Sequence, residues 1–218
     1  MDDGADVVKI ALESGSAFGL KIPVLSKEEA AEIVQVAHQR GTRVSAHVLA
    51  SDDLPRVLEA GVDDIAHMVS DPLSDEYISR IVQAGIYWVP TIELWMNVGS
   101  GGQQAVKNLR RFVAAGGKVA LGTDYAGYNA EFDLGMPIRE LEWMLEAGMS
   151  IQQAIVAGTR NAAYVCNLGH ELGTLEVGKI ADVLVVNGDP LLDIHALLNV
   201  RMVIHSGEVI RAFPSATG

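Results

Sequence analysis

A single unit recurs five times in the first 150 residues: a short apolar run, then a longer amphipathic stretch that ends at a glycine. Such glycines are well placed to take the left-handed conformation that ends a helix before the next strand. Apolar runs without strict alternation predict parallel strands covered by helices, so the expected fold class is α/β. The strand and helix pairs are 6–12 with 27–40, 42–48 with 53–60, 64–68 with 73–84, 86–92 with 103–115 and 119–123 with 134–147, ending at Gly41, Gly61, Gly85, Gly116 and Gly148.

The pattern changes after the fifth unit. Residues 150–168 read as one more helix, and from Leu175 onward the chain has short β runs at 182–186, 201–205 and 208–211. Asn187-Gly188 and Ser206-Gly207 have the composition of tight turns between such runs. We therefore expect a βα body over residues 1–168 and a small β element over residues 169–218.

Composition excludes several classes of partner. Of the 218 residues, 28 are acidic and 16 basic, and the formal net charge of -12 argues against binding to nucleic acid or to an anionic membrane surface. Charged residues interrupt every apolar segment before the roughly 18 residues that a membrane span needs. The single cysteine cannot form an internal disulfide, and the first residues do not read as a secretion signal, so a cytoplasmic location is expected.

Potential metal ligands stand at or near the ends of four of the five predicted strands. His47, His67 and Asp124 end three of them, Lys9 lies within the first, and the run that ends in Pro90-Thr91 offers no ligand. One histidine at a strand end is more often a hydrogen-bonded core residue, and one aspartate there often caps the next helix. Because carboxyl ends of parallel strands meet at one edge, however, the four together predict a site for a divalent metal such as zinc.

Lys9 has a special place in this hypothesis. A lysine inside an apolar strand must lose its proton, find an anionic partner or be modified, because burial of an unpaired ammonium is costly. A neutral amine can form a carbamate, which is in effect a carboxylate that can bridge two cations. The sequence therefore leaves open one or two metal ions at this edge.

The same residues carry a resemblance to a known family. His47 in VSAHV, His67 in DDIAHM and Asp124 in ALGTDYAG, followed by the tail TRNAAYVCNLGHELGTLEVGKIADVLVVNGDPLLDI and VRMVIHSGEVIR, resemble the amidohydrolase superfamily. The similarity is greatest to its imidazolonepropionase-like and Xaa-Pro dipeptidase (prolidase-like) branch. It implies a (β/α)8 TIM barrel with a small β-sandwich, one or two divalent metals, expected to be zinc, and hydrolysis of amide or related carbon–nitrogen bonds.

The resemblance also implies roles for individual residues. Lys9 matches the strand-four lysine that is carboxylated and bridges two metals, and His47 and His67 match the ligands of strands five and six. Asp124 matches the strand-eight aspartate that contacts metal and moves the proton of the attacking water. His67 is alternatively a residue that orients the substrate, so Asp124 and His67 are the expected catalytic residues.

One departure from the family pattern concerns the start of the barrel. The family opens with a His-X-His pair on strand one, and this chain has no His-X-His. About 148 residues precede the tail, whereas a complete barrel needs about 250. The expectation is a partial barrel of strands four to eight, a C-terminal piece whose open edges pair with an N-terminal half or with a second copy.

The substrate pocket is harder to predict. The segments 95–102 and 125–133 follow strands and are expected to be loops, so Trp95, Tyr125 and Tyr128 are candidate contacts for a small amide or dipeptide, with simple packing as the alternative. Two rival functions remain at this stage. One is a non-catalytic half-barrel scaffold with weak or no metal binding, and the other is a small-molecule-binding module without metal.

Overall fold

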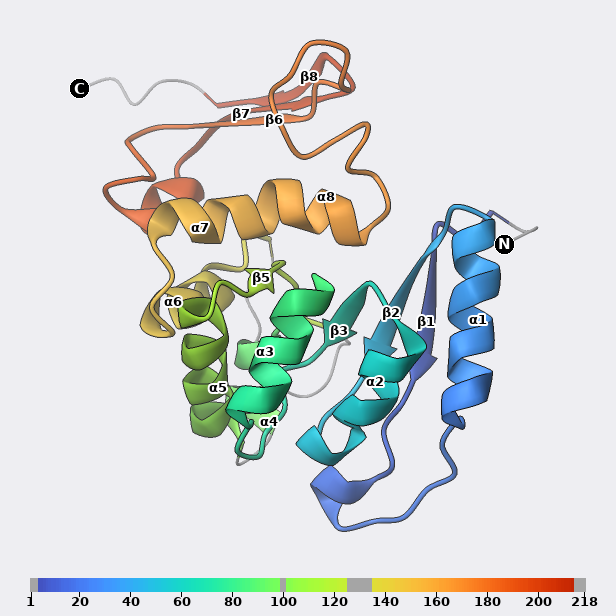
Figure 1. Ribbon diagram of the computed structural model, residues 1–218. Helices are drawn as coiled ribbons and strands as arrows, with labels where there is room; N and C mark the ends of the chain where they lie inside the picture. Colours follow the sequence, from blue (N-terminus) through green and yellow to red (C-terminus); the bar gives the residue numbers. More distant parts are fainter. Residues whose placement is uncertain (1–3, 99–100, 125–134, 214–218) are drawn as a thin grey trace.

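The structure, a computed structural model, describes residues 4–98, 101–124 and 135–213. Five parallel strands form one sheet in the order in which they occur along the chain (Figure 1). This arrangement confirms the α/β class and the parallel pairing expected from the repeated unit. The strands are β1 (Val7–Ala11), β2 (Arg43–His47), β3 (Asp64–Ala66), β4 (Tyr87–Val89) and β5 (Lys118–Val119).

Helices follow the strands and pack along one side of the sheet (Figure 1). The five glycines expected to end helices all have positive φ, between 71° and 91°, so the predicted helix ends are confirmed. A serine at position 26 caps the first helix by accepting a hydrogen bond from the backbone N–H of Glu29. The helices after the strands are α1 (Lys27–Gln39), α2 (Leu54–Ala60), α3 (Asp75–Ala84), α5 (Gly102–Ala114) and α6 (Ile138–Glu146).

One helix occupies a segment that was expected to be a loop. α4 (Ile92–Val98) begins where the fourth strand was expected to end, and β4 stops at Val89. The carboxylate of Glu140 accepts the backbone N–H groups of Ile92 (2.9 Å) and Glu93 (2.7 Å), and so stabilises the start of this helix. The prediction of a loop over 95–102 was therefore wrong for its first part, while the predicted loop over 125–133 lies outside the described residues.

The two faces of the sheet differ in chemistry. Val44, Ala46, Ile65 and Trp88 are fully buried beneath the helices and form the centre of the core. The ring of Trp88 meets Phe112 of α5 edge to face, with 5.2 Å between centroids. Because successive side chains of a strand alternate between faces, the residues between them point to the opposite face, and this face carries most of the polar side chains.

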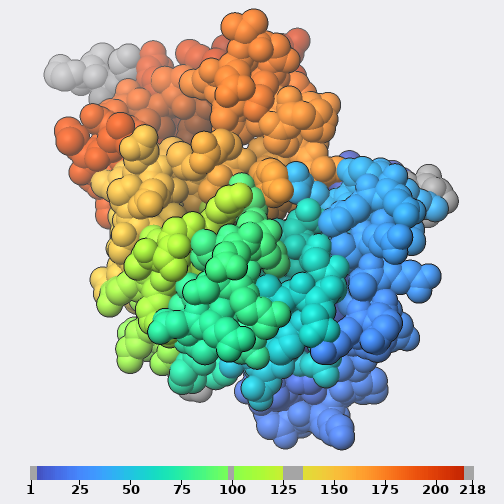
Figure 2. Space-filling view, viewed as in Figure 1, coloured from blue at the N-terminus to red at the C-terminus, as the bar shows by residue number. Residues whose placement is uncertain are grey.

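The C-terminal part forms a second layer at one end of the molecule. Residues 151–165 are helical, with α7 (Ile151–Val156), a π-helical turn (Ala157–Asn161) and α8 (Ala162–Val165) in succession. An antiparallel sheet of β6 (Val183–Val186), β7 (Val200–His205) and β8 (Glu208–Ala212) follows, as the β runs of the tail predicted. Figure 2 shows these residues, coloured from yellow-orange to red, gathered at the top of the molecule.

Short 3-10 helices complete the fold, at Ser16–Phe18, Ser51–Asp53 and Ile194–Leu198. A hollow of about 500 Å³ lies between β1 and α1, lined by Val8, Leu25 and Ile33 among others. It lies on the helix-covered side of the sheet, because Val8 and Lys9 point to opposite faces. No helix in the described residues has the length and apolar character that a membrane crossing requires.

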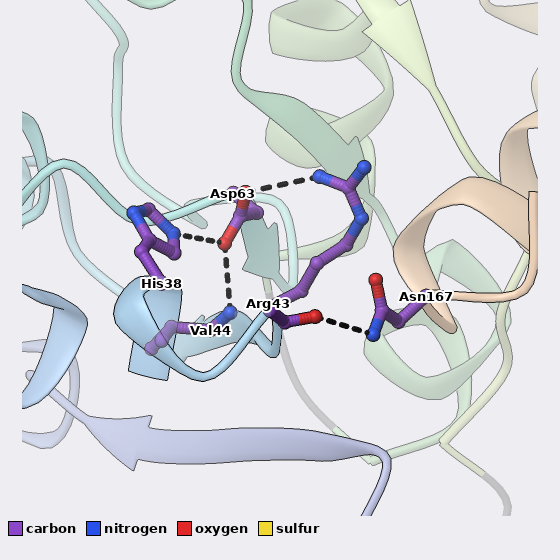
Figure 3. Close-up of polar contacts among 6 residues, drawn as sticks. His38, Arg43, Val44, Asp63 and Asn167 are labelled. Atoms are coloured by element: carbon purple, nitrogen blue, oxygen red, sulfur yellow. Dashed lines mark hydrogen bonds and ion pairs between the residues drawn. The ribbon is translucent and has the colours of Figure 1, made fainter. Parts of the chain in front are cut away.

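Asp63 anchors the amino-terminal ends of the strands (Figure 3). Its carboxylate accepts hydrogen bonds from the backbone N–H of Val44 (2.8 Å) and from the Arg43 guanidinium (3.0 Å). Nε2 of His38, in the last turn of α1, lies 2.8 Å from the same carboxylate. One side chain therefore joins α1, β2 and the turn before β3.

The same corner of the sheet is tied to the end of α8. The guanidinium carbon of Arg43 lies 3.4 Å from the centroid of the Tyr164 ring, a cation–π contact. Asn167 donates a hydrogen bond of 2.9 Å to the backbone carbonyl of Gly41 (Figure 3). These contacts hold the C-terminal helices against the first two βα units.

Replacement of Asp63 with alanine is expected to lower the free energy of unfolding by about 2–3 kcal/mol, because it removes a charged acceptor and leaves the Val44 N–H without it. Urea denaturation monitored by circular dichroism measures this loss. Asp52→Ala, a change at an exposed aspartate, serves as the control and is expected to change stability by less than about 0.5 kcal/mol. Equal stability of the two variants would contradict the anchoring role.

Candidate active site at the strand ends

Three of the predicted site residues meet at the carboxyl ends of the strands. His47 is the last residue of β2, His67 follows β3, and Asp124 follows the strand segment that begins with β5. The imidazole rings of His47 and His67 lie edge to face, with 4.7 Å between centroids. Nε2 of His67 lies 3.8 Å from Oδ2 of Asp124. The structure thus brings together two imidazoles and one carboxylate from three different βα units.

Lys9 lies on the same face, but its environment differs from the one expected. It pairs in register with Ser45, two residues before His47 on the neighbouring strand. Its side chain is exposed, because described residues do not cover the polar face of the sheet over β1. The expected burial of this amine was therefore wrong for the described structure, and the carboxylation of Lys9 implied by the resemblance stays a prediction.

Burial keeps both site histidines neutral at physiological pH. Desolvation, followed by the nearby His47 and Lys9, lowers the pKa of His67 to about 3. Desolvation also lowers the pKa of His47, and Lys9 adds to this effect. A neutral imidazole has one ring nitrogen with a free lone pair, which is the form that binds metal ions.

The donor atoms fit a divalent metal in type. Nε2 of His67 is buried and has no hydrogen-bond partner among the described residues. Two imidazole nitrogens and a carboxylate oxygen are the ligands that zinc and similar ions prefer. In the part of the chain that is described, no three His, Cys, Asp or Glu side chains stand close enough to enclose an ion.

Strained backbone marks three successive strand ends. His67, Thr91 and Asp124 have φ values of 73°, 49° and 51°, in the left-handed region that residues other than glycine seldom adopt. Such conformations persist where the surrounding structure over-determines them, and they concentrate at functional sites. Of these three residues, Thr91 was missed by the sequence argument, because the strand before it supplies no ligand.

Buried and half-buried carboxylates link the loops around the site. Glu13, after β1, accepts the backbone N–H of Leu49, after β2, at 2.9 Å. Asp71, after β3, accepts the backbone N–H of Ser51, in the loop after β2, at 2.8 Å. We call these contacts, together with those of Glu140 at the start of α4, the loop links. They fix the loops that carry the site relative to one another.

The candidate substrate contacts are placed less favourably for that role. Trp95 is in α4, its side chain is buried in the core, and its Nε1–H donates to the backbone carbonyl of Met68 at 2.8 Å. This hydrogen bond holds the segment that follows His67. Tyr125 and Tyr128 lie outside the described residues.

Fold and site together define a class of protein. The chain has five parallel βα units, and its ionisable side chains converge where the strands end. Enzymes of α/β architecture place their catalytic groups at this edge, on loops that a rigid sheet holds in position. The arrangement is similar to the one found in α/β enzymes.

The family is also defined. The chain belongs to the Amidohydrolase family, which it matches over residues 2–210. It is 29% identical over 209 residues to the imidazolonepropionase of Geobacillus sp. (strain WCH70), an alignment that covers 93% of this chain. The resemblance seen in the sequence motifs is therefore confirmed.

Solved structures show the same relationship. A Xaa-Pro dipeptidase crystallised with methionine in its active site has a TM-score of 0.82 and 31% identity over 97% of this chain. The A. niger ochratoxinase has a TM-score of 0.82 and 28% identity over 97% of the chain. The chain spans about half the length of these relatives: 42% of the imidazolonepropionase, 56% of the dipeptidase and 52% of the ochratoxinase.

Proposed function

We propose that the chain forms strands four to eight of a TIM barrel and the site residues of a metal-dependent hydrolase acting on carbon–nitrogen bonds. The observation that carries the proposal is the meeting of His47, His67 and Asp124 at adjoining strand ends. Membership of the Amidohydrolase family supports it. In this proposal residues 1–168 form the catalytic part and residues 169–218 the β element beside it.

His47 and His67 are the residues proposed to hold the metal, with Asp124 and a carboxylated Lys9 as further ligands. When bound, a divalent ion such as zinc acidifies water and polarises the carbonyl group of the substrate. Asp124, whose carboxylate is about two-fifths exposed, accepts the proton of the attacking water and delivers it to the leaving nitrogen. The buried ring of His67 stays neutral and keeps its position during this transfer.

The relatives indicate the class of substrate. They include enzymes named for hydrolysis of an imidazolone ring and of Xaa-Pro dipeptides. We therefore propose a small amide, cyclic amide or dipeptide as the substrate, in the cytoplasm. Further barrel strands, from an N-terminal half or from a second copy of the chain, are proposed to pair with the free edge of β1 and complete the ligand set.

Purified protein is expected to contain one or two equivalents of a divalent metal, and its removal by a chelator should lower the unfolding temperature. A ligand present at 1,000 times its dissociation constant stabilises the folded state by about 4 kcal/mol. Elemental analysis and thermal unfolding with and without chelator measure both effects.

Two variants sharpen the same experiment. His67→Ala is expected to lose the metal and the response to chelator, while His170→Ala, a change at an exposed histidine, should retain both. Metal-free protein whose unfolding temperature responds to neither chelator nor added zinc would overturn the proposal. That result would favour the scaffold alternative, a half-barrel without metal.

A further inference from the structure

Thr91, which follows β4, contacts the site histidine His67 although it is not itself a proposed metal ligand. We propose that Thr91 is a positioning residue, whose hydroxyl holds the His67 ring in the tautomer with the proton on Nδ1 and a free lone pair on Nε2. The effect of this contact on metal binding rests on the proposed function. The contact itself stands independently of it.

The contact is short and buried. Oγ1 of Thr91 lies 2.8 Å from Nδ1 of His67. Both residues are at most 2% exposed, so water does not compete for the ring nitrogen. Such a bond fixes both the rotation of the ring and the direction in which its other nitrogen points.

The backbone of His67 is also held by residues of β4, the strand that precedes Thr91. Its N–H donates to the carbonyl of Val89 at 2.9 Å, and its carbonyl accepts the indole N–H of Trp88 at 2.6 Å. The next N–H, that of Met68, donates to the carbonyl of Pro90 at 2.9 Å. With the Thr91 contact, the described structure satisfies every polar atom of His67 except Nε2.

Thr91 itself is held in a strained conformation. Its φ of 49° is unfavourable for a β-branched side chain, whose second γ atom crowds the backbone. The two N–H groups that follow it, those of Ile92 and Glu93, are bound by the buried carboxylate of Glu140. The backbone next to Thr91 is therefore held by contacts that do not involve His67.

The tautomer follows from what surrounds the ring. If Thr91 donated to Nδ1, the proton of His67 would be on Nε2, a buried N–H that makes no hydrogen bond among the described residues, since Oδ2 of Asp124 lies 3.8 Å away, beyond hydrogen-bond distance. Buried N–H groups without an acceptor are rarer than buried acceptors without a donor. Acceptance by the hydroxyl places the proton on Nδ1 instead and leaves the Nε2 lone pair directed at the proposed metal.

The test uses two substitutions of Thr91. Thr91→Val removes the hydroxyl but keeps the branched shape, and Thr91→Ser keeps the hydroxyl. In metal-free protein, ¹⁵N NMR of the His67 ring is expected to show the Nδ1-protonated tautomer in the wild type and in T91S, and a mixture of tautomers in T91V. Zinc affinity, measured by chelator competition, is expected to fall about 10–100-fold in T91V and to stay close to the wild-type value in T91S.

Thr42→Val, which removes the hydroxyl of a buried threonine just before β2, is the matched control and should leave ring signals and zinc affinity unchanged. A wild-type ring protonated on Nε2, or a T91V variant with wild-type ring signals, would overturn the inference. If T91V does not fold, Thr91→Ala replaces it, and the wild-type and T91S spectra still decide. Failure of wild-type protein to bind zinc, with the ring signals as expected, would count against the proposed function alone.

Discussion

Asp124→Asn is expected to lower kcat/KM for hydrolysis of a carbon–nitrogen bond by about 10²–10⁴-fold, the range that general acid–base catalysis contributes. Asparagine preserves the size of the side chain and one acceptor oxygen, but it cannot take up a proton. The Asp124 carboxylate is 3.8 Å from Nε2 of His67 and is partly open to solvent, so it can meet both water and substrate. Binding of metal should be affected less than turnover.

The assay uses N-acyl amino acids and Xaa-Pro dipeptides, and it follows release of the free amino acid. It is run on the chain alone and on the chain mixed with the N-terminal segment of a full-length relative. Asp75→Asn, a change at an exposed residue that begins α3, is the matched control and should keep wild-type activity. Turnover by the Asp124 variant within about threefold of wild type would rule out the proton-carrying role, and absence of any wild-type turnover in both settings would count against catalysis.

Glu140→Ala should cause the largest loss of stability. Glu140 is fully buried, and its two carboxylate oxygens each accept one backbone N–H at the start of α4. Each buried donor left unsatisfied costs about 1–3 kcal/mol, so the free energy of unfolding should fall by about 2–6 kcal/mol. Glu146→Ala, on the same helix but exposed and paired with Arg110, should cost less than about 1 kcal/mol. Equal urea midpoints for the two variants would contradict this assignment.

Glu140 also predicts how stability depends on pH. Burial raises the pKa of Glu140 from 4.5 to about 7, so between these values the folded state binds the proton more tightly than the unfolded state. The contribution of this group to stability is therefore complete below about pH 4.5, declines as the pH rises toward about 7, and is constant above it. The decline should be weaker in Glu140→Ala, as urea denaturation at pH 5 and pH 8 would show.

The order and direction of the strands could be predicted from the sequence because local signals determine them. A glycine ends each of the five helices in the left-handed conformation, and the runs between them are apolar without strict alternation of polar residues. The meeting of His47, His67 and Asp124 follows from the same regularity, since strands in sequential order place their carboxyl ends side by side. These features need no knowledge of tertiary contacts.

Other features depend on residues far apart in the sequence. α4 begins at Ile92 because a carboxylate 48 residues later accepts its N–H, and local propensity carries no sign of it. The role of Thr91 depends on the register of β3 and β4 and on an unusual backbone conformation. Lys9 was expected to be buried because its neighbours are apolar, yet the two faces of β1 differ in exposure.

The loop links have a consequence for the divergence of specificity. In the links made by Glu13 and Asp71, the acceptor belongs to one loop and its donor, at Leu49 or Ser51, to the loop beside it. If one loop were replaced by the corresponding loop of a relative, the loop that remains would keep a charged acceptor or a backbone donor without its hydrogen-bond partner. Loops around this site are therefore expected to be inherited, and to be transplanted successfully, as neighbouring pairs.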